Sequence, residues 1–107
     1  MNDPTFVEAS RKLAERTLNS VKESDSEKLT WIFRTTTSRT PSARELTLLQ
    51  DTLTKARNHY AGNPELARQL MTVGESDLDS SLPVLEIAAY SAIANALLNA
   101  DEVITKN

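Results

Sequence analysis

An acidic stretch in the C-terminal third of the chain has the spacing of a calcium-binding loop. Glu75, Asp77 and Asp79 alternate with other residues, and Glu86 stands at the twelfth position counted from Glu75. Calcium loops take carboxylate ligands at such alternating positions and a bidentate carboxylate at the twelfth. These four residues are therefore weak candidates for metal ligands.

The same stretch departs from a calcium loop at three positions. The first ligand is Glu75 rather than aspartate, Ser80 stands where the sharp turn requires glycine, and Pro83 occupies the ninth position. The ordinary interpretation of residues 75–82 is a solvated acidic loop. Glu86 would then be stabilised by the N-terminus of the following helix, because the helix dipole favours negative charge there.

Three arginines, Arg34, Arg39 and Arg44, gather around an expected junction between two helices. Serine and threonine hydroxyls lie among them, and a capped helix N-terminus begins at Ser42. Guanidinium groups and free backbone amides together can hold an anion or an acidic partner. Arginine is also favoured in the last turn of a helix, so a purely structural role is the alternative.

Trp31 is displaced from the apolar stripe of its expected helix. Leu29, Ile32 and Phe33 form that stripe, and Trp31 falls about one position outside it. The indole is expected either to cover an edge of the core or to present an exposed contact surface, since tryptophan is enriched at interaction hot spots. Trp31 is therefore a weak candidate for partner binding.

The content of histidine and cysteine excludes several kinds of catalytic site. His59 is the only histidine, and there is no cysteine. Disulfides, thiolate metal sites, Cys-His pairs and thioether-attached haem are excluded within this chain, and no G-x-S-x-G turn indicates a serine nucleophile. No catalytic or cofactor-binding residue is predicted, and His59 is expected to have a structural role near a helix C-terminus.

Length and charge further limit the classes of protein to which the chain could belong. The 107 residues fit a single domain with one core. The net charge is −3, without the basic footprint of a nucleic-acid-binding protein. No stretch reaches the roughly 18 apolar residues of a membrane span, and the N-terminus lacks the pattern of a signal peptide.

Apolar residues recur at spacings of three and four along the chain, which predicts an all-α fold. In the first helix this stripe consists of Phe6, Ala9, Leu13, Thr17 and Val21, with Leu18 beside them. Ser42 and Glu45 have the spacing of a capping box. The expected helices span residues 4–23 and 26–38, then run from the Ser42 cap to Gly62, from Pro64 to Gly74, and onward from Pro83.

Two of these helices have distinctive compositions. The second ends in the poor helix formers Thr35, Thr36 and Thr37, so it is expected to fray there. The last has no charged residue between Ile87 and Ala100, and a helix that is uncharged on every side is buried on most sides. We therefore expect a compact bundle of about five helices with this C-terminal helix at its centre. The expected central residues are Ile87, Ala88, Ile93, Ala94, Leu97 and Leu98.

Three segments carry a resemblance to a known family. They read MNDPTFVEASRKLAER, FRTTTSRTPSARELTLL and LEIAAYSAIANALLNADEVITKN. The chain resembles the C-terminal portion of the planctomycete-specific domain of unknown function that ends large exported, cytochrome-c-containing proteins. The likeness covers essentially all 107 residues, and it departs from the usual pattern at Tyr90 and Ala100, where relatives tend to carry tryptophan and leucine.

The resemblance implies a larger parent protein. Such proteins begin with an export signal and a c-type haem domain, and two uncharacterised domains follow. The chain would then be a C-terminal fragment with an exported location. Haem is expected only in an upstream domain, and the expected partners are the upstream domains or another protein. The family supplies no catalytic residues to carry over.

Three functional hypotheses follow. The leading one is a non-catalytic helical module that packs against its parent chain or a partner. The second is part of an enzyme cleft, completed by upstream domains, in which Asp3, Asp101 and Glu102 supply carboxylates; a cap and a polar helix end explain these residues equally well. The third is a small-ligand or calcium-binding module, which depends on the acidic stretch alone.

Overall fold

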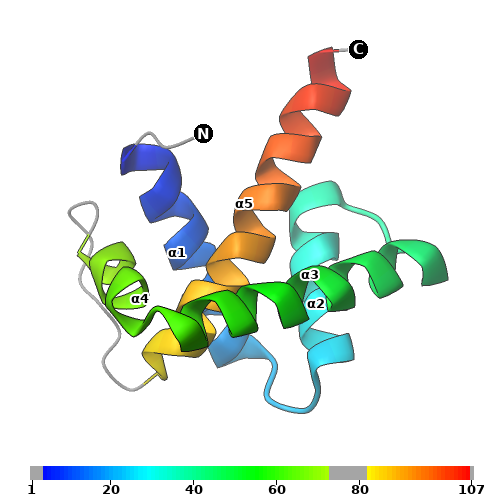
Figure 1. Cartoon of the computed structure of the whole chain (residues 1–107). Helices are drawn as coiled ribbons and strands as arrows, with labels where there is room; N and C mark the ends of the chain where they lie inside the picture. The colour runs from blue at the N-terminus through cyan, green and yellow to red at the C-terminus, as the bar shows by residue number, and fades with distance from the viewer. Residues whose placement is uncertain (1–3, 73–81, 107) are drawn as a thin grey trace.

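The computed structural model describes the backbone of residues 4–72 and 82–106, and within these the side chains of residues 7–72 and 82–99. The described residues form five helices and no strand (Figure 1). The all-α bundle expected from the sequence is confirmed. The helices are α1 (Pro4–Ser20), α2 (Asp25–Thr37), α3 (Ala43–Gly62), α4 (Pro64–Met71) and α5 (Val84–Lys106).

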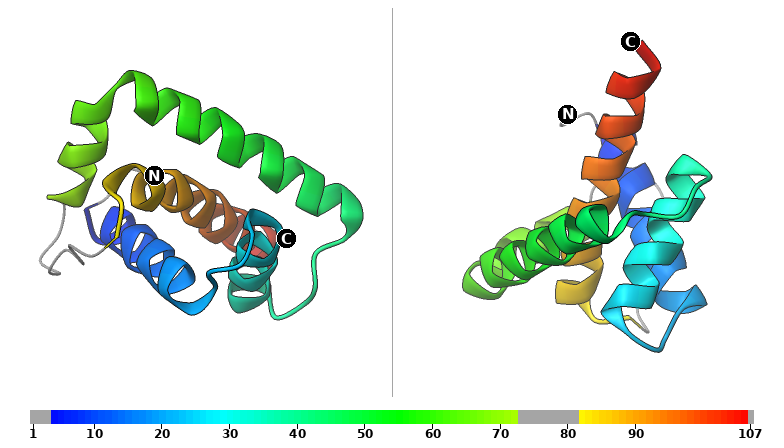
Figure 2. Two further views of the ribbon diagram at one scale, coloured as in Figure 1. Left: turned by 90° about the horizontal axis from the view of Figure 1, so that it is seen from below. Right: turned by 90° about the vertical axis from the view of Figure 1, so that its right-hand side faces the viewer.

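Helix α5 runs through the middle of the bundle, with α1 on one side and α3 on the other (Figure 2). The expected central residues Ile87, Ala88, Ile93 and Ala94 are fully buried, and Leu97 is nearly so. Leu98 is only half-buried. The reason is that α5 projects past the other helices toward its C-terminus (Figure 1), so Leu98 lies at the edge of the core.

The connection between α1 and α2 begins earlier than expected. Helix α1 ends at Ser20, and the last bond of helical type runs from the Val21 N–H to the Thr17 carbonyl at 3.0 Å. The Ser24 hydroxyl then accepts a hydrogen bond from the Glu27 N–H at 3.1 Å and caps α2. The connection between the two helices therefore consists of residues 21–24.

The threonine run at the end of α2 does not fray. The hydroxyls of residues 35–37 each donate a hydrogen bond to the carbonyl oxygen four residues earlier, at 2.8, 3.0 and 2.7 Å. These bonds give the hydroxyls a partner within the helix. Helix α2 ends at Thr37, and Ser38 caps it with a positive φ of 64° and an N–H donated to the Arg34 carbonyl.

The starts of α3 and α4 match the sequence prediction. Ser42 and Glu45 form the expected capping box, with the Ser42 hydroxyl accepting from the Glu45 N–H at 3.1 Å. Helix α4 begins at Pro64 and ends at Met71. The expected end at Gly74 and nearly all of the acidic stretch lie outside the described residues.

The buried face of α1 includes Leu13, Thr17 and Leu18 of the expected stripe but differs from it elsewhere. Ala9 is exposed, whereas Arg11 is fully buried and Glu15 is 4% exposed. The Arg11 guanidinium lies 3.5 Å from the Glu15 carboxylate one turn later. Burial of a charge requires such pairing. A charged pair therefore occupies part of the buried face of α1. Apolar periodicity alone does not predict charged residues at these positions.

Candidate functional site

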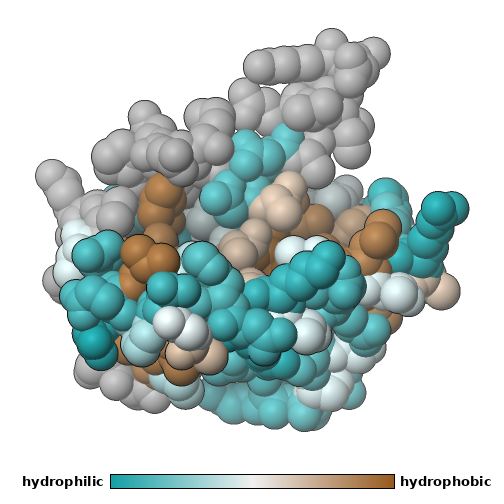
Figure 3. Space-filling view, viewed as in Figure 1, coloured by the Kyte–Doolittle hydropathy of each residue, from teal (hydrophilic) through white to brown (hydrophobic). Residues whose placement is uncertain are grey.

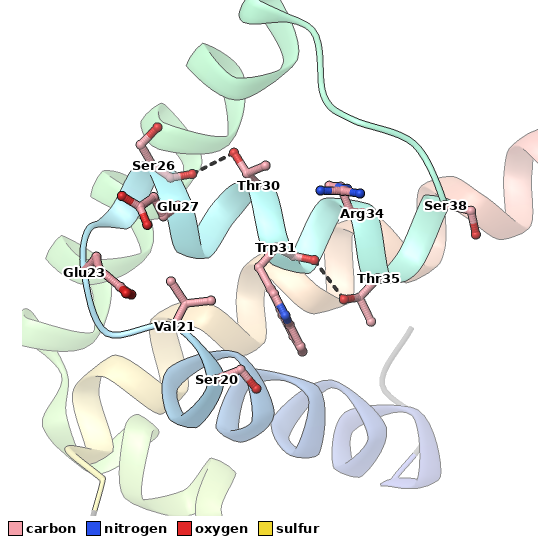
Figure 4. A pocket seen from close by; sticks show the side chains of 10 residues that line it. All are labelled: Ser20, Val21, Glu23, Ser26, Glu27, Thr30, Trp31, Arg34, Thr35 and Ser38. Atoms are coloured by element: carbon pink, nitrogen blue, oxygen red, sulfur yellow. Dashed lines mark hydrogen bonds between the residues drawn. The ribbon is translucent and has the colours of Figure 1, made fainter.

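An open groove of about 680 Å³ lies between the end of α1 and the outer face of α2 (Figure 4). Helix α2 presents residues at spacings of three and four to this groove, while Leu29, Ile32 and Phe33 face the core. The same helix therefore has a buried face and a groove face. The lining residues are Ser20, Val21, Glu23, Ser26, Glu27, Thr30, Trp31, Arg34, Thr35 and Ser38.

Trp31 is the principal apolar side chain of the groove. Its indole extends from α2 toward α1 (Figure 4), where it is half-buried and packs against the core. The Arg16 guanidinium of α1 lies 5.7 Å from the ring centroid, a distance suited to a cation–π interaction. Trp31 thus covers an edge of the core, which is one of the two roles expected from the sequence, and it also lines the groove.

Charges of opposite sign lie at different places along the groove. Glu23 and Glu27 lie near the start of α2, and Arg34 lies farther along the helix (Figure 4). Arg34 is exposed and makes no ion pair with a residue that the structure describes. Its guanidinium group is therefore available to a carboxylate from outside the chain.

The three arginines singled out in the sequence have separate roles. Arg39 is bound by Glu45 through two hydrogen bonds of 2.8 and 2.7 Å, and its guanidinium lies 4.8 Å from the Phe33 ring centroid. The Arg39 hydrogen bonds, together with one from the Ser42 backbone, lower the pKa of Glu45 to about 2. Arg44 is exposed and lies outside the groove lining. Arg34 is therefore the member of this set that lines the groove.

A charged cluster that sequence analysis missed joins three helices. Arg57 on α3 is hydrogen-bonded to Asp25 of α2 and to Glu86 of α5, and the Tyr90 hydroxyl donates to Asp25 at 2.8 Å. The Arg57 hydrogen bonds, with a smaller contribution from Tyr90, lower the pKa of Asp25 to about 2. Burial and the bond to Asp25 raise the pKa of Tyr90.

The weak metal candidates are divided between this cluster and the undescribed part of the chain. Glu86 is paired with Arg57 at 2.6 Å, and Glu75, Asp77 and Asp79 lie outside the described residues. Among the residues that the structure describes, no group of three or more acidic, histidine or cysteine side chains could hold a metal ion.

The remaining candidates contribute no described site. His59 is exposed, and its ring meets the Tyr60 ring edge-to-face at 5.0 Å. Asp3 lies outside the described residues, as do the side chains of Asp101 and Glu102. No described helix combines the length and hydropathy required to cross a membrane.

The face that carries α3 and α4 offers a weaker candidate surface than the groove. In Figure 3 this face is mostly hydrophilic, with small separate apolar areas. Among the side chains that the structure describes, the exposed large apolar ones are Leu48, Leu66 and Leu85. Apolar residues that reach a surface singly are ordinary in soluble proteins and indicate no binding site by themselves.

The fold and the groove define a small all-α module with one amphipathic surface groove. Residues 1–53 match the family model described as "PSD1: Protein of unknown function (DUF1553)". The matched segment includes α1, α2 and the first half of α3, and therefore all the residues that line the groove. No curated protein and no solved structure matches the chain.

Proposed function

We propose that this chain is a non-catalytic helical module that docks onto another domain of a larger exported protein, which carries c-type haem elsewhere. The observation that carries the docking proposal is the groove between α1 and α2, which is lined by Trp31 and by Arg34, a side chain without an ion pair to any described residue. The parent protein, its haem and its exported location rest on the resemblance described above. The match of residues 1–53 to a family of unknown function is compatible with this resemblance.

The groove specifies the chemistry of the docked segment. Tryptophan and arginine are the residue types that most often dominate binding energy at interfaces. Arg34 favours a carboxylate, Trp31 favours an apolar or aromatic side chain, and the acidic pair Glu23 and Glu27 favours a basic group. We therefore propose a segment of the parent chain that offers acidic, apolar and basic side chains in that spatial order.

The charged cluster around Arg57 supports a structural role over a catalytic one. An effective general base has a pKa near the working pH, whereas the pKa of Asp25 is about 2. Both Asp25 oxygens already accept hydrogen bonds, from Arg57 and Tyr90. Asp25 is therefore held as a fully paired carboxylate, which suits a link between helices.

The test is a calorimetric titration of this chain into the parent protein truncated before Met1. Saturable binding with a negative heat-capacity change is expected, because docking at Trp31 buries apolar surface. Absence of binding at high micromolar concentrations would contradict the proposal.

Substitutions locate the contact. Trp31→Ala and Arg34→Glu are each expected to weaken binding by about tenfold or more, as for hot-spot residues. Arg44→Glu is the matched control, because Arg44 is also exposed but lies outside the groove. Equal losses for Arg34→Glu and Arg44→Glu would show a general charge effect and would reject the groove as the docking site.

A further inference from the structure

A second, smaller pocket lies on a different part of the bundle. It has a volume of about 200 Å³ and lies among residues of α1, α3, α4 and α5. It shares no lining residue with the groove. The lining residues are Val7, Ser10, Tyr60, Leu70, Ser91, Ala92 and Asn95.

Two buried hydroxyls of residues that line this pocket have no hydrogen-bond partner within the described part of the chain. Ser10 is 2% exposed and Ser91 is 4% exposed, and neither Oγ atom is hydrogen-bonded to a described residue. A buried polar group without a partner is costly and requires an explanation. Other hydroxyls in the chain show the usual solution, since Thr17 bonds to the carbonyl four residues earlier at 2.8 Å. Both serines line the pocket, and rotation about χ1 is the movement that would bring either buried Oγ atom within reach of a molecule there.

The other polar groups of the pocket are also uncharged. Asn95 accepts a hydrogen bond from Asn99 at 2.8 Å through its amide oxygen, which leaves its amide nitrogen as a donor. Burial raises the pKa of Tyr60 above its ordinary value of 10.0, so its hydroxyl is protonated at neutral pH. Val7, Leu70 and Ala92 supply apolar surface. The lining favours an uncharged ligand, because a charge here would be buried without a counter-ion.

We propose that this pocket binds a small uncharged molecule that carries a hydroxyl group on an apolar body. The hydroxyl bonds to Ser10 on α1 and Ser91 on α5, and the apolar body contacts Val7 and Leu70. Pockets for drug-sized ligands occupy about 300–1,000 Å³, so a volume of about 200 Å³ selects a molecule of single-ring size. The proposal is independent of docking at the groove.

The experiment is an NMR titration of the isotopically labelled chain with phenol, followed at the backbone amides of Ser10, Ser91 and Tyr60. Saturable shifts of these resonances are expected. Toluene, which has a similar shape but no hydroxyl, should bind about fivefold or more weakly, the change that loss of one neutral hydrogen bond produces. Absence of saturable shifts with phenol, or equal affinity for toluene, would overturn the proposal.

Alanine variants separate ligand binding from helix packing. Alanine keeps the small size that lets α1 and α5 approach, so Ser10→Ala and Ser91→Ala should fold with an equal or higher Tm. Each should weaken phenol binding by about fivefold. Ser20→Ala, at an exposed α1 position outside this pocket, is the control and should leave affinity unchanged. Unchanged phenol affinity in both Ser10→Ala and Ser91→Ala would assign these serines to packing alone and reject the site.

Discussion

Arg57 on α3 donates two hydrogen bonds to the carboxylate of Asp25, at 2.7 and 2.8 Å, across a separation of 32 residues in the sequence. The same guanidinium donates two more to Glu86 in the first turn of α5, at 3.0 and 2.6 Å. One cation therefore links the starts of α2 and α5 to the second half of α3. Bidentate arginine–carboxylate pairs combine strength with fixed geometry.

Replacement of Arg57 should destabilise the fold. Arg57→Met keeps much of the aliphatic stem but leaves Asp25 and Glu86 without their shared counter-ion. The three side chains are 30–40% exposed, so we expect a loss of about 1–3 kcal/mol, below the value for fully buried pairs. Urea denaturation measures it. The control is Lys55→Met, whose exposed pair with Asp51 should contribute less than about 1 kcal/mol; equal losses would contradict the role of the cluster.

Acid should weaken the protein partly through Asp25. Folding lowers the pKa of this carboxyl from 3.8 to about 2, chiefly through the Arg57 hydrogen bonds. A lowered folded-state pKa gives stability that is present above the unfolded value and is lost as the pH falls through the folded value. The free energy of unfolding should therefore fall between pH 3.8 and about 2. Glu45 contributes in the same range, so the comparison is with Asp25→Asn. Identical pH slopes for the two proteins would exclude Asp25 as a source.

Truncation of the central helix core should be costly. Ile93 is fully buried on α5, and Ile93→Ala removes apolar contacts and leaves a cavity. The expected loss is about 2–5 kcal/mol, measured by chemical denaturation. Leu48→Ala is the control, because Leu48 is 60% exposed on α3 and should change stability by no more than about 0.5 kcal/mol. Comparable losses would contradict the central position of α5.

A glycine at the end of α2 should stabilise the protein. Ser38 has a φ of 64°, a left-handed conformation that glycine adopts without a steric penalty. Ser38→Gly should raise stability by up to about 1 kcal/mol, as judged by the Tm. Ser26→Gly tests the backbone argument in reverse, because Ser26 lies inside α2 and glycine there should lower stability. A lower Tm for Ser38→Gly would show that the serine side chain is needed at that position.

Local patterns in the sequence were sufficient to predict the helices. The Ser42 and Glu45 capping box lies within four residues, and the uncharged run from Ile87 onward requires only composition to indicate burial. The end of α2 was harder to predict, because helix propensity alone does not account for the hydroxyl-to-carbonyl hydrogen bonds of residues 35–37. Local chemistry there outweighed intrinsic preference.

The sites depended on contacts that periodicity does not encode. Arg57 is an ordinary polar residue in the sequence, and its partners are 29 and 32 residues away. The acidic first turns of α2 and α5 offered a signal that a cation would bind them, but not which one. The groove was only partly indicated. The spacing of three residues between Trp31 and Arg34 places them on one face of α2, but the hollow beside that face follows from the packing of α1 against α2.

The central position of α5 has a consequence for the order in which the molecule can form. During synthesis α1, α2, α3 and α4 leave the ribosome before α5, yet α1 and α3 pack chiefly against it. The nascent helices therefore expose their apolar faces until the last helix is available to cover them. The core can be completed only after nearly the whole described chain has been synthesised. A nascent chain stalled before Val84 would expose apolar surfaces to which chaperones bind.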